Sequence, residues 1–200
     1  MASPTEMQKL TRESMMTLEA YAKARKEFRA KVIAHKKPRT VHLGEHLTLV
    51  FEDELTIRYQ VQEMLRIEKI FEEQGIQDEI DAYSSLIPDG GNFKATMLIE
   101  YEDPEERRVA LEKLKGIEDR VYMQVEGSAP VYAIADEDLE RENEQKTSAV
   151  HFLRFEMTKE MAAALKYGVA LAIGVDHPAY SAKLDPVSPA TRSALIQDLG

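Results

Sequence analysis

The spacing of apolar residues along the first fifty positions predicts a helix followed by a hairpin. Apolar residues recur at helical intervals after Thr11, which is placed to cap the helix, and Pro38 ends the pattern. Apolar residues then alternate with polar ones on both sides of Gly44. Such alternation around a glycine is typical of a β-hairpin.

A longer helical pattern runs from near Asp53 to Gly75, and glycine commonly follows the last turn of a helix. Its first part, residues 55–61, also alternates like a strand. A short helix is expected next, over residues 77–84. Residues 10–84 are therefore predicted to form a helical and hairpin extension.

The central part of the chain has a pattern of alternating strands and helices. Asp103 is placed to cap a helix, with Pro104 at its first position and Gly116 at its end. The expected elements are strand 94–101, helix 103–116, strands 121–126 and 131–135, a very polar helix 136–146 and strand 150–155. This β-α-β-β-α-β order is the split pattern of ferredoxin-like folds. We therefore expect an α+β fold with such a core over residues 93–175, and one domain over residues 1–200.

An apolar run over residues 161–175 predicts a buried helix that packs on this core and is too short to span a bilayer. Its small residues are spaced by four, at Ala164, Gly168 and Ala172. Another backbone could approach closely along that line, so we expect either an intramolecular contact or a homodimer contact there. Residues 185–200 contain two prolines and are expected to be a mobile tail.

Two acidic residues interrupt the apolar side of the longer predicted helix. That side contains Ile57, Val61 and Phe71. At about 100° per residue, Glu68 falls near the centre of the apolar arc and Glu72 falls toward its edge. A charge that faces a core must be paired or bound. We therefore expect Glu68 and Glu72 to meet either a basic partner or a ligand.

The last strand of the predicted core supplies two further candidates. Arg154 lies between apolar neighbours and needs an acid, which makes it the first candidate partner for Glu68 or Glu72. His151 points to the other face of the strand, because successive side chains alternate. A histidine in this position is more often a hydrogen-bonded residue of the core or of a sheet edge than a catalytic base.

A divalent metal is the alternative companion for the two glutamates, because Glu68 and Glu72 at i, i+4 could both bind one ion. His42 and His46 flank the glycine of the hairpin. With a loop of residues 43–45 they would face each other and could chelate, whereas with a two-residue loop they would not pair directly. Ordinary surface histidines are the simpler interpretation.

The opposite side of the longer helix has a mixed composition, with Tyr59, Glu63 and Arg66 in one arc. Glu63 can pair with Arg66 at i, i+3. This side is either a solvated face with an internal ion pair or an interface with another protein. In the second case Tyr59 would be its anchor.

Composition narrows the class of protein. Hydrophobic residues at 44% and charged residues at 31% are ordinary for a soluble globular chain. The absence of cysteine excludes disulfides, thiolate metal sites and cysteine nucleophiles. No familiar catalytic or nucleotide-binding motif occurs, and no cofactor is evident. The first thirty residues lack a secretory pattern, so we expect a cytoplasmic protein with no membrane partner.

The net charge of −10 argues against a nucleic-acid partner, since such binding neutralises phosphates. The charge is unevenly distributed. Residues 23–39 contain eight basic residues and one acid, whereas residues 136–144 contain six acids and Arg141 alone as a base. We expect these two segments to dock within a protomer or across a dimer, with a polyanion or an acidic partner as the alternative for the basic segment.

Five segments together resemble a bacterial family of proteins of unknown function. They are VIAHKKPRTVHLG, YQVQEMLRIEKI, GIQDEIDAYSSLIPDGGNFKATMLIE, IADEDLERENEQKTSAVHFLRFE and GVDHPAY, and the resemblance covers roughly Leu10 to Tyr180. The family is often encoded beside rubrerythrin-like proteins and iron–sulfur oxidoreductase subunits, which implies a redox or oxidative-stress setting. The resemblance implies no activity and no catalytic residues. It does place His35, Glu63, Arg66, Asp89, Lys94, His151 and His177 in recurrent segments.

Three hypotheses of function follow from the sequence. The first is an accessory or binding protein that acts through protein–protein contacts, with a redox protein as its partner. The second is a metal-dependent enzyme or sensor with a carboxylate and histidine site. The third is a structural homo-oligomer joined by its basic and acidic segments.

Overall fold

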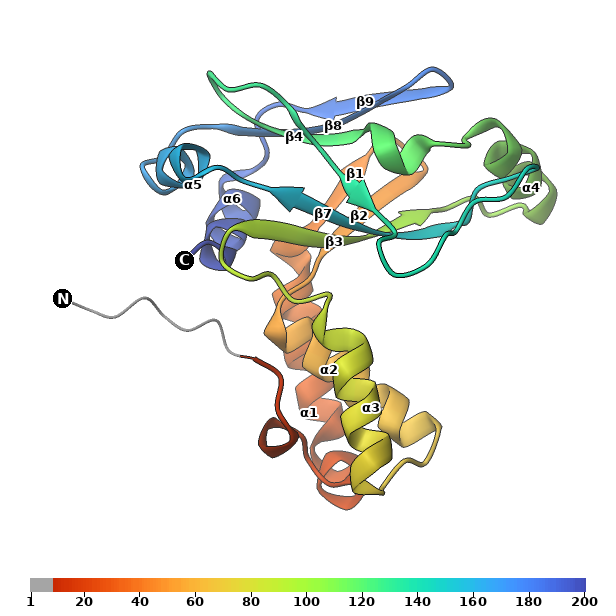
Figure 1. The fold of residues 1–200 in the computed structure, drawn as a ribbon, viewed down its shortest axis with the longest axis vertical. Coiled ribbons are helices and arrows are strands. Elements are labelled where there is room, and N and C mark those ends of the chain that lie inside the picture. The colour runs from red at the N-terminus through yellow and green to blue at the C-terminus, as the bar shows by residue number, and fades with distance from the viewer. Residues whose placement is uncertain (1–8) are drawn as a thin grey trace.

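A computed structural model describes residues 9–200, which form a helical arm attached to two antiparallel sheets (Figure 1). The arm consists of α1 (Leu18–Lys36), α2 (Glu54–Ile67) and α3 (Glu73–Ser84), preceded by the short 3₁₀ helix η1 (Arg12–Ser14). The arm projects away from the sheets, and the connection between α2 and α3 lies toward its far end (Figure 1).

The first sheet has five strands in the order β1-β2-β3-β7-β6. They are β1 (Thr40–Leu43), β2 (Leu47–Phe51), β3 (Asn92–Ile99), β7 (Val150–Glu156) and β6 (Ile134–Ala135). The second sheet has four strands in the order β5-β4-β8-β9. They are β5 (Val131–Tyr132), β4 (Val121–Val125), β8 (Leu171–His177) and β9 (Tyr180–Leu184).

Helices lie around the ends of the sheets. They are α4 (Pro104–Lys113), α5 (Lys159–Lys166) and α6 (Pro189–Leu195), with the 3₁₀ helices η2 (Lys37–Arg39), η3 (Ile117–Arg120) and η4 (Ile196–Asp198). The two sheets form two layers (Figure 1). They share one core, because alternate residues of both, such as Phe93 of β3 and Met123 of β4, are fully buried in the same cluster.

The arm has a separate core of its own. In α2 the buried residues Ile57, Val61 and Leu65 repeat every four positions and pack with Ile76 and Ile80 of α3. The helix begins at a capping box, in which the Asp53 side chain accepts a hydrogen bond from the backbone N–H of Thr56.

A buried arginine holds the arm, the first sheet and the C-terminal segment together. Arg39, 2% exposed, donates hydrogen bonds to the backbone carbonyls of Phe51, Glu52 and Ala194 and to the carboxylate of Asp198 at 2.5 Å. Burial raises the pKa of Asp198 to about 6, although Arg39 acts in the opposite direction. Removal of either partner would leave a buried charge without compensation.

Several elements expected from the sequence are confirmed. The hairpin turns at Gly44, whose φ is 71°, and the short helix before residue 84 is α3. The α4 helix has Asp103 as its N-cap and Pro104 at its first position, and the side chain of Asp103 accepts hydrogen bonds from the N–H groups of Glu105 and Glu106.

The mixed α and β class is confirmed, but the ferredoxin-like order is not. The strands expected to form one sheet are divided, because β3 and β7 belong to the first sheet and β4 to the second. The hairpin of β1 and β2 also belongs to the first sheet and not to an extension. Residues 136–146 form bends and a bridge between Glu142 and Thr147 in place of the polar helix. Their single large apolar residue, Leu139, offers too little surface to pack a helix on a sheet.

The prediction of one helix from near Asp53 to Gly75 was wrong. Lys69 has a φ of 55° and the N–H of Ile70 donates to the carbonyl of Leu65, which is the geometry of a Schellman stop. Gly75 instead lies inside α3, where a Cβ atom would stand 2.8 Å from the Ile70 side chain. The glycine therefore permits close packing and does not end a helix.

The C-terminal part also differs from the expectation. The apolar run over residues 161–175 is divided by a turn at Gly168, whose φ is 101°, so Ala164 lies in α5 and Ala172 in β8. The three small residues do not share a helix face and cannot form the expected contact stripe. The segment after residue 185 is not a loose tail, because it forms α6 and η4 and buries Leu195 and Leu199 in the core.

Candidate functional site

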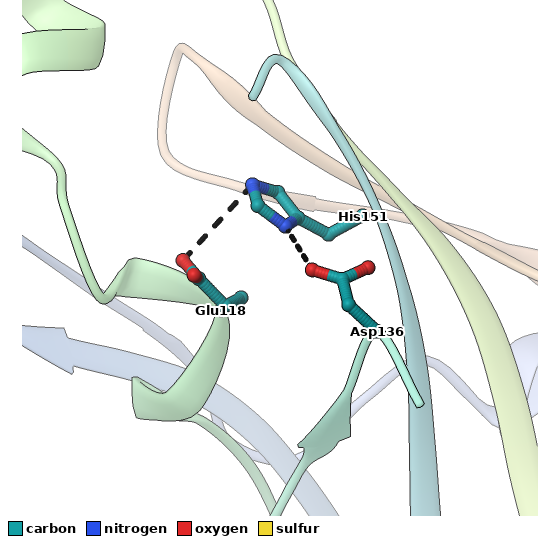
Figure 2. A group of neighbouring side chains, drawn as sticks. All are labelled: Glu118, Asp136 and His151. Carbon is teal, nitrogen blue, oxygen red and sulfur yellow. Dashed lines mark hydrogen bonds and ion pairs between the residues drawn. The ribbon is translucent and has the colours of Figure 1, made fainter. Parts of the chain in front are cut away.

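A buried histidine lies at the centre of a polar cluster with Glu118 and Asp136 (Figure 2). His151 is on the inward face of β7 and is 0% exposed. Its Nδ1 is 2.5 Å from Oδ2 of Asp136. Its Nε2 is 2.9 Å from both the backbone carbonyl oxygen of Ser148 and Oγ1 of Thr147. Both ring nitrogens therefore face oxygen atoms.

Asp136 reaches the histidine because the chain turns sharply just after β6. Its φ is 51°, a left-handed conformation that aspartate tolerates better than most residues. Its second oxygen, Oδ1, accepts hydrogen bonds from the N–H of Phe152 at 3.0 Å and from Arg141 at 3.2 Å. The carboxylate is thus fixed on three sides.

Glu118 approaches the other ring nitrogen from η3, with Oε2 4.0 Å from Nε2 of His151 (Figure 2). Thr147 Oγ1 lies 3.4 Å from the same oxygen. Burial raises the pKa of Glu118, and a backbone hydrogen bond and the proximity of His151 oppose this shift. Glu118 is therefore the least well partnered acid of the cluster.

This arrangement satisfies a histidine that carries protons on both nitrogens, since Asp136 and the carbonyl of Ser148 only accept hydrogen bonds. The line of Thr147, His151 and Asp136 resembles a nucleophile, base and acid in order. Thr147 is, however, only 1% exposed, so a substrate could not reach its hydroxyl without opening of the core. The geometry favours a locked polar network over a nucleophilic site.

A metal ion could fit on only one side of the histidine. Ligand atoms of Glu118, Asp136 and His151 lie within 4.8 Å of one another. The 2.5 Å between Asp136 and Nδ1 is too short for a bridging ion, because two ligands at about 2.0–2.2 Å from a metal stand roughly 3 Å or more apart. The 4.0 Å between Oε2 of Glu118 and Nε2 is long enough for an ion that replaces the proton of Nε2 and its contacts with Ser148 and Thr147, and Asp136 would then orient the ring from behind.

The predicted buried carboxylates are not buried. Glu68 is the C-cap of α2 and is exposed, and Glu72 is exposed in the loop before α3. The helix stops at Ile67, so the arc that placed them against the core ends before reaching them. Neither a core ion pair nor a metal site between Glu68 and Glu72 is supported.

The predicted partner of these glutamates was also wrong, and the alternative in which His42 and His46 chelate an ion is not supported. Arg154 forms ion pairs with Glu137 at 2.7 Å and with Glu156, far from the tip of the arm. His42 is opposite Thr48 in the hairpin register. His46 instead stacks on Tyr101 with ring centroids 3.8 Å apart. The loop covers residues 44–46, one position later than chelation requires.

The mixed face of α2 is used inside the arm. Glu63 pairs with Arg66 at 3.2 Å, as expected, but it also binds Arg25 of α1 at 2.7 Å. Tyr59 is half-buried, and its ring lies 5.9 Å from that of Phe28 in α1. Both residues therefore join α1 to α2, and Tyr59 is not free to anchor a partner.

Sequence reasoning missed an apolar surface at the far end of the arm. Ile67 ends α2 and is 57% exposed, and Phe71 in the following loop is 73% exposed. We define these two residues as the arm tip. The apolar spacing predicts Phe71 on the buried arc, and no residue type near Lys69 signals the end of the helix.

A cleft beside the base of the arm offers little room for a ligand. Its volume is about 220 Å³, below the roughly 300–1,000 Å³ of small-molecule sites. Its charged walls are already engaged, because Lys94 donates to the carbonyl of Ser85 and Glu52 accepts from Thr96.

Every helix among residues 9–200 is too short or too polar to span a membrane.

Comparisons with known proteins agree with the resemblance seen in the sequence. A family model described as "Protein of unknown function (DUF3501)" matches residues 9–199. A crystal structure of a novel protein of unknown function from Burkholderia pseudomallei is 59% identical, with a TM-score of 0.91. The match covers 96% of this chain and 100% of that one. No curated protein matches the chain.

Proposed function

We propose that this chain, which belongs to the DUF3501 family, is an accessory protein that acts by binding another protein through its arm tip. The single observation that carries the proposal is the exposure of Ile67 and Phe71 at the end of a projecting arm (Figure 1). Exposed apolar side chains that lie together mark interaction sites, whereas a single one such as Tyr167 is ordinary.

The arm tip has the properties of an anchor. The Schellman stop at Lys69 and the packing of Ile70 against Gly75 fix the loop, so little conformational entropy is lost when Phe71 is covered. Full burial of an aromatic or branched side chain contributes about 1.5–3 kcal/mol. Two such residues together supply the centre of a small interface, which polar neighbours would surround.

The proposed setting is a bacterial redox or oxidative-stress system in the cytoplasm, with a redox protein as the partner. This part of the proposal rests on the sequence segments that resemble the family. The arm tip is consistent with it, because a partner that holds its own metal centres needs only a contact surface from this chain.

Affinity capture from extract of the native cell tests the proposal. Wild-type protein should recover one or a few specific proteins, and Phe71→Ser should lose them. Tyr167→Ser is the matched control, because Tyr167 is 91% exposed after α5 and away from the arm. Equal recovery by the wild type and Phe71→Ser, or recovery of the protein alone, would contradict the proposal.

A second candidate function is a metal-dependent sensor or enzyme. It is favoured by one observation, the gap between Glu118 and Nε2 of His151 in front of a ring oriented by Asp136. Metal analysis of protein without a histidine tag should then find stoichiometric metal that Glu118→Gln loses and His42→Ala retains. Absence of metal, or equal loss in both variants, counts against this candidate.

A further inference from the structure

The outward face of α1 and Lys37, which follows the helix, form a basic stripe. Lys26, Arg29, Ile33 and Lys37 recur at intervals of three and four and are all exposed. They point away from the buried face of the helix, on which Phe28 lies. Ile33 is 51% exposed in the middle of the three cations. We call these four residues the basic stripe.

The acidic loop, residues 136–146, has the complementary composition. Leu139 at its centre is 63% exposed. Glu140 and Glu144 are exposed beside it, and no ion pair among residues 9–200 involves either side chain. The loop lies by β6 and β7, in the sheets and not in the arm (Figure 1).

These two surfaces do not meet within one chain. Both lie on the same molecule, yet the ion pairs among residues 9–200 join each surface only to its own surroundings. Lys23 next to the stripe pairs with Glu19, and Arg141 in the loop pairs with Asp138. The opposite charges of the stripe and the loop are therefore available to another molecule.

We propose that the basic stripe binds the acidic loop of a second copy of this chain, with Ile33 seated against Leu139. Two features match across the contact, since each surface carries an excess of one sign of charge beside one exposed aliphatic side chain. Desolvation at an aliphatic contact strengthens the ionic pairs around it. The contact does not involve the arm tip, so it goes beyond the proposed partner binding.

The charge of the whole chain sets the conditions under which this association occurs. Two copies at −10 each repel at long range, and the local contact must overcome this repulsion. The Debye length falls from about 10 Å at 0.1 M salt to about 3 Å at 1 M, which weakens exposed ion pairs. We expect the association constant to fall at least about tenfold between 0.1 M and 0.5 M sodium chloride.

A charge exchange tests the proposal by analytical ultracentrifugation of the full chain. A stripe variant carries Lys26→Glu and Arg29→Glu, and a loop variant carries Glu140→Lys and Glu144→Lys. Each variant alone should be monomeric, because like charges then face each other. An equimolar mixture should associate again, because each reversed surface meets its reversed counterpart.

The mixture also separates the proposal from misfolding, since a variant that failed to fold could not regain association. Arg107→Glu with Lys159→Glu is the matched control, because both residues are exposed on other helices. It should associate like the wild type. A monomeric wild type at 0.1 M salt, association that survives the stripe variant, or a mixture that stays monomeric would overturn the proposal. Binding of heparin by a monomeric wild type would assign the stripe to a polyanion instead.

Discussion

Glu63→Gln should weaken the arm in a way that depends on pH. The Glu63 carboxylate accepts hydrogen bonds from Arg25 at 2.7 Å, from the Tyr21 hydroxyl at 2.8 Å and from Arg66 at 3.2 Å. The bond from Arg25, more than the others, lowers the pKa of Glu63 from 4.5 to about 2. Glutamine keeps the shape and an acceptor for Tyr21, so the substitution removes mainly the charge.

The expected loss of unfolding free energy follows from the pKa shift of Glu63. Each pKa unit corresponds to about 1.4 kcal/mol, so the shift corresponds to about 3 kcal/mol at most. The Arg25 side chain is 34% exposed, and screening by solvent reduces the expected loss at pH 7 to about 1–2 kcal/mol. A lowered acid pKa stabilises the fold above pH 4.5 and ceases to do so as the pH falls through about 2.

Urea unfolding, followed by circular dichroism, measures the unfolding free energy at pH 7 and pH 3. The difference in unfolding free energy between the wild type and Glu63→Gln should fall by more than half at pH 3. Glu72→Gln is the control, because Glu72 is exposed in the loop before α3. It should change stability by less than about 0.5 kcal/mol. A difference for Glu63→Gln that is absent at pH 7, or equal at both pH values, would refute the reasoning.

Three further predictions concern the buried polar groups. Asp136→Asn should lower the unfolding free energy by about 1.5–3 kcal/mol, because it removes the charge that accepts from His151; a loss below 0.5 kcal/mol in urea unfolding would argue against the network. Because the pKa of Asp198 is raised to about 6, the wild type should lose stability relative to Asp198→Asn as the pH rises from about 4 to 6; parallel stability curves for the two would contradict this. Arg39→Met should lower the unfolding free energy by about 3–5 kcal/mol, since it leaves Asp198 and three carbonyls unpaired. Thermal or urea unfolding measures this loss, and an unchanged stability would contradict the prediction.

Local signals in the sequence were sufficient for elements that are defined by their own residues. Asp103 followed by Pro104 specifies the start of α4 without help from the rest of the chain. The alternation around Gly44 likewise specifies the hairpin. The sequence could not show that β3 and β4 belong to different sheets, because alternation reveals which residues are buried but not which strand lies beside them.

The errors came from positions where tertiary structure decides between two local patterns. An apolar run such as residues 171–175 suits a buried strand as well as a buried helix, and the left-handed turn at Gly168 settles the choice. Lys69 adopts a positive φ that favours glycine, so nothing in its identity marked the end of α2.

The candidate site was only partly visible in the sequence. His151 was recognised as a core histidine with a hydrogen bond, and its burial agrees with that interpretation. Its neighbours could not be named, because Glu118 and Asp136 come from segments that only the fold brings together. A buried acid on a short 3₁₀ helix such as Glu118 has no periodic pattern by which it could be found.

Covalent capture at the arm tip in living cells tests the central claim most directly. A photo-crosslinking phenylalanine analogue at position 71 would report what lies against Phe71, and the same analogue at position 167 would serve as the control. If the arm tip binds another protein, we expect one discrete adduct from position 71 and none of that mass from position 167. No adduct from position 71, or the same adducts from both positions, would contradict it.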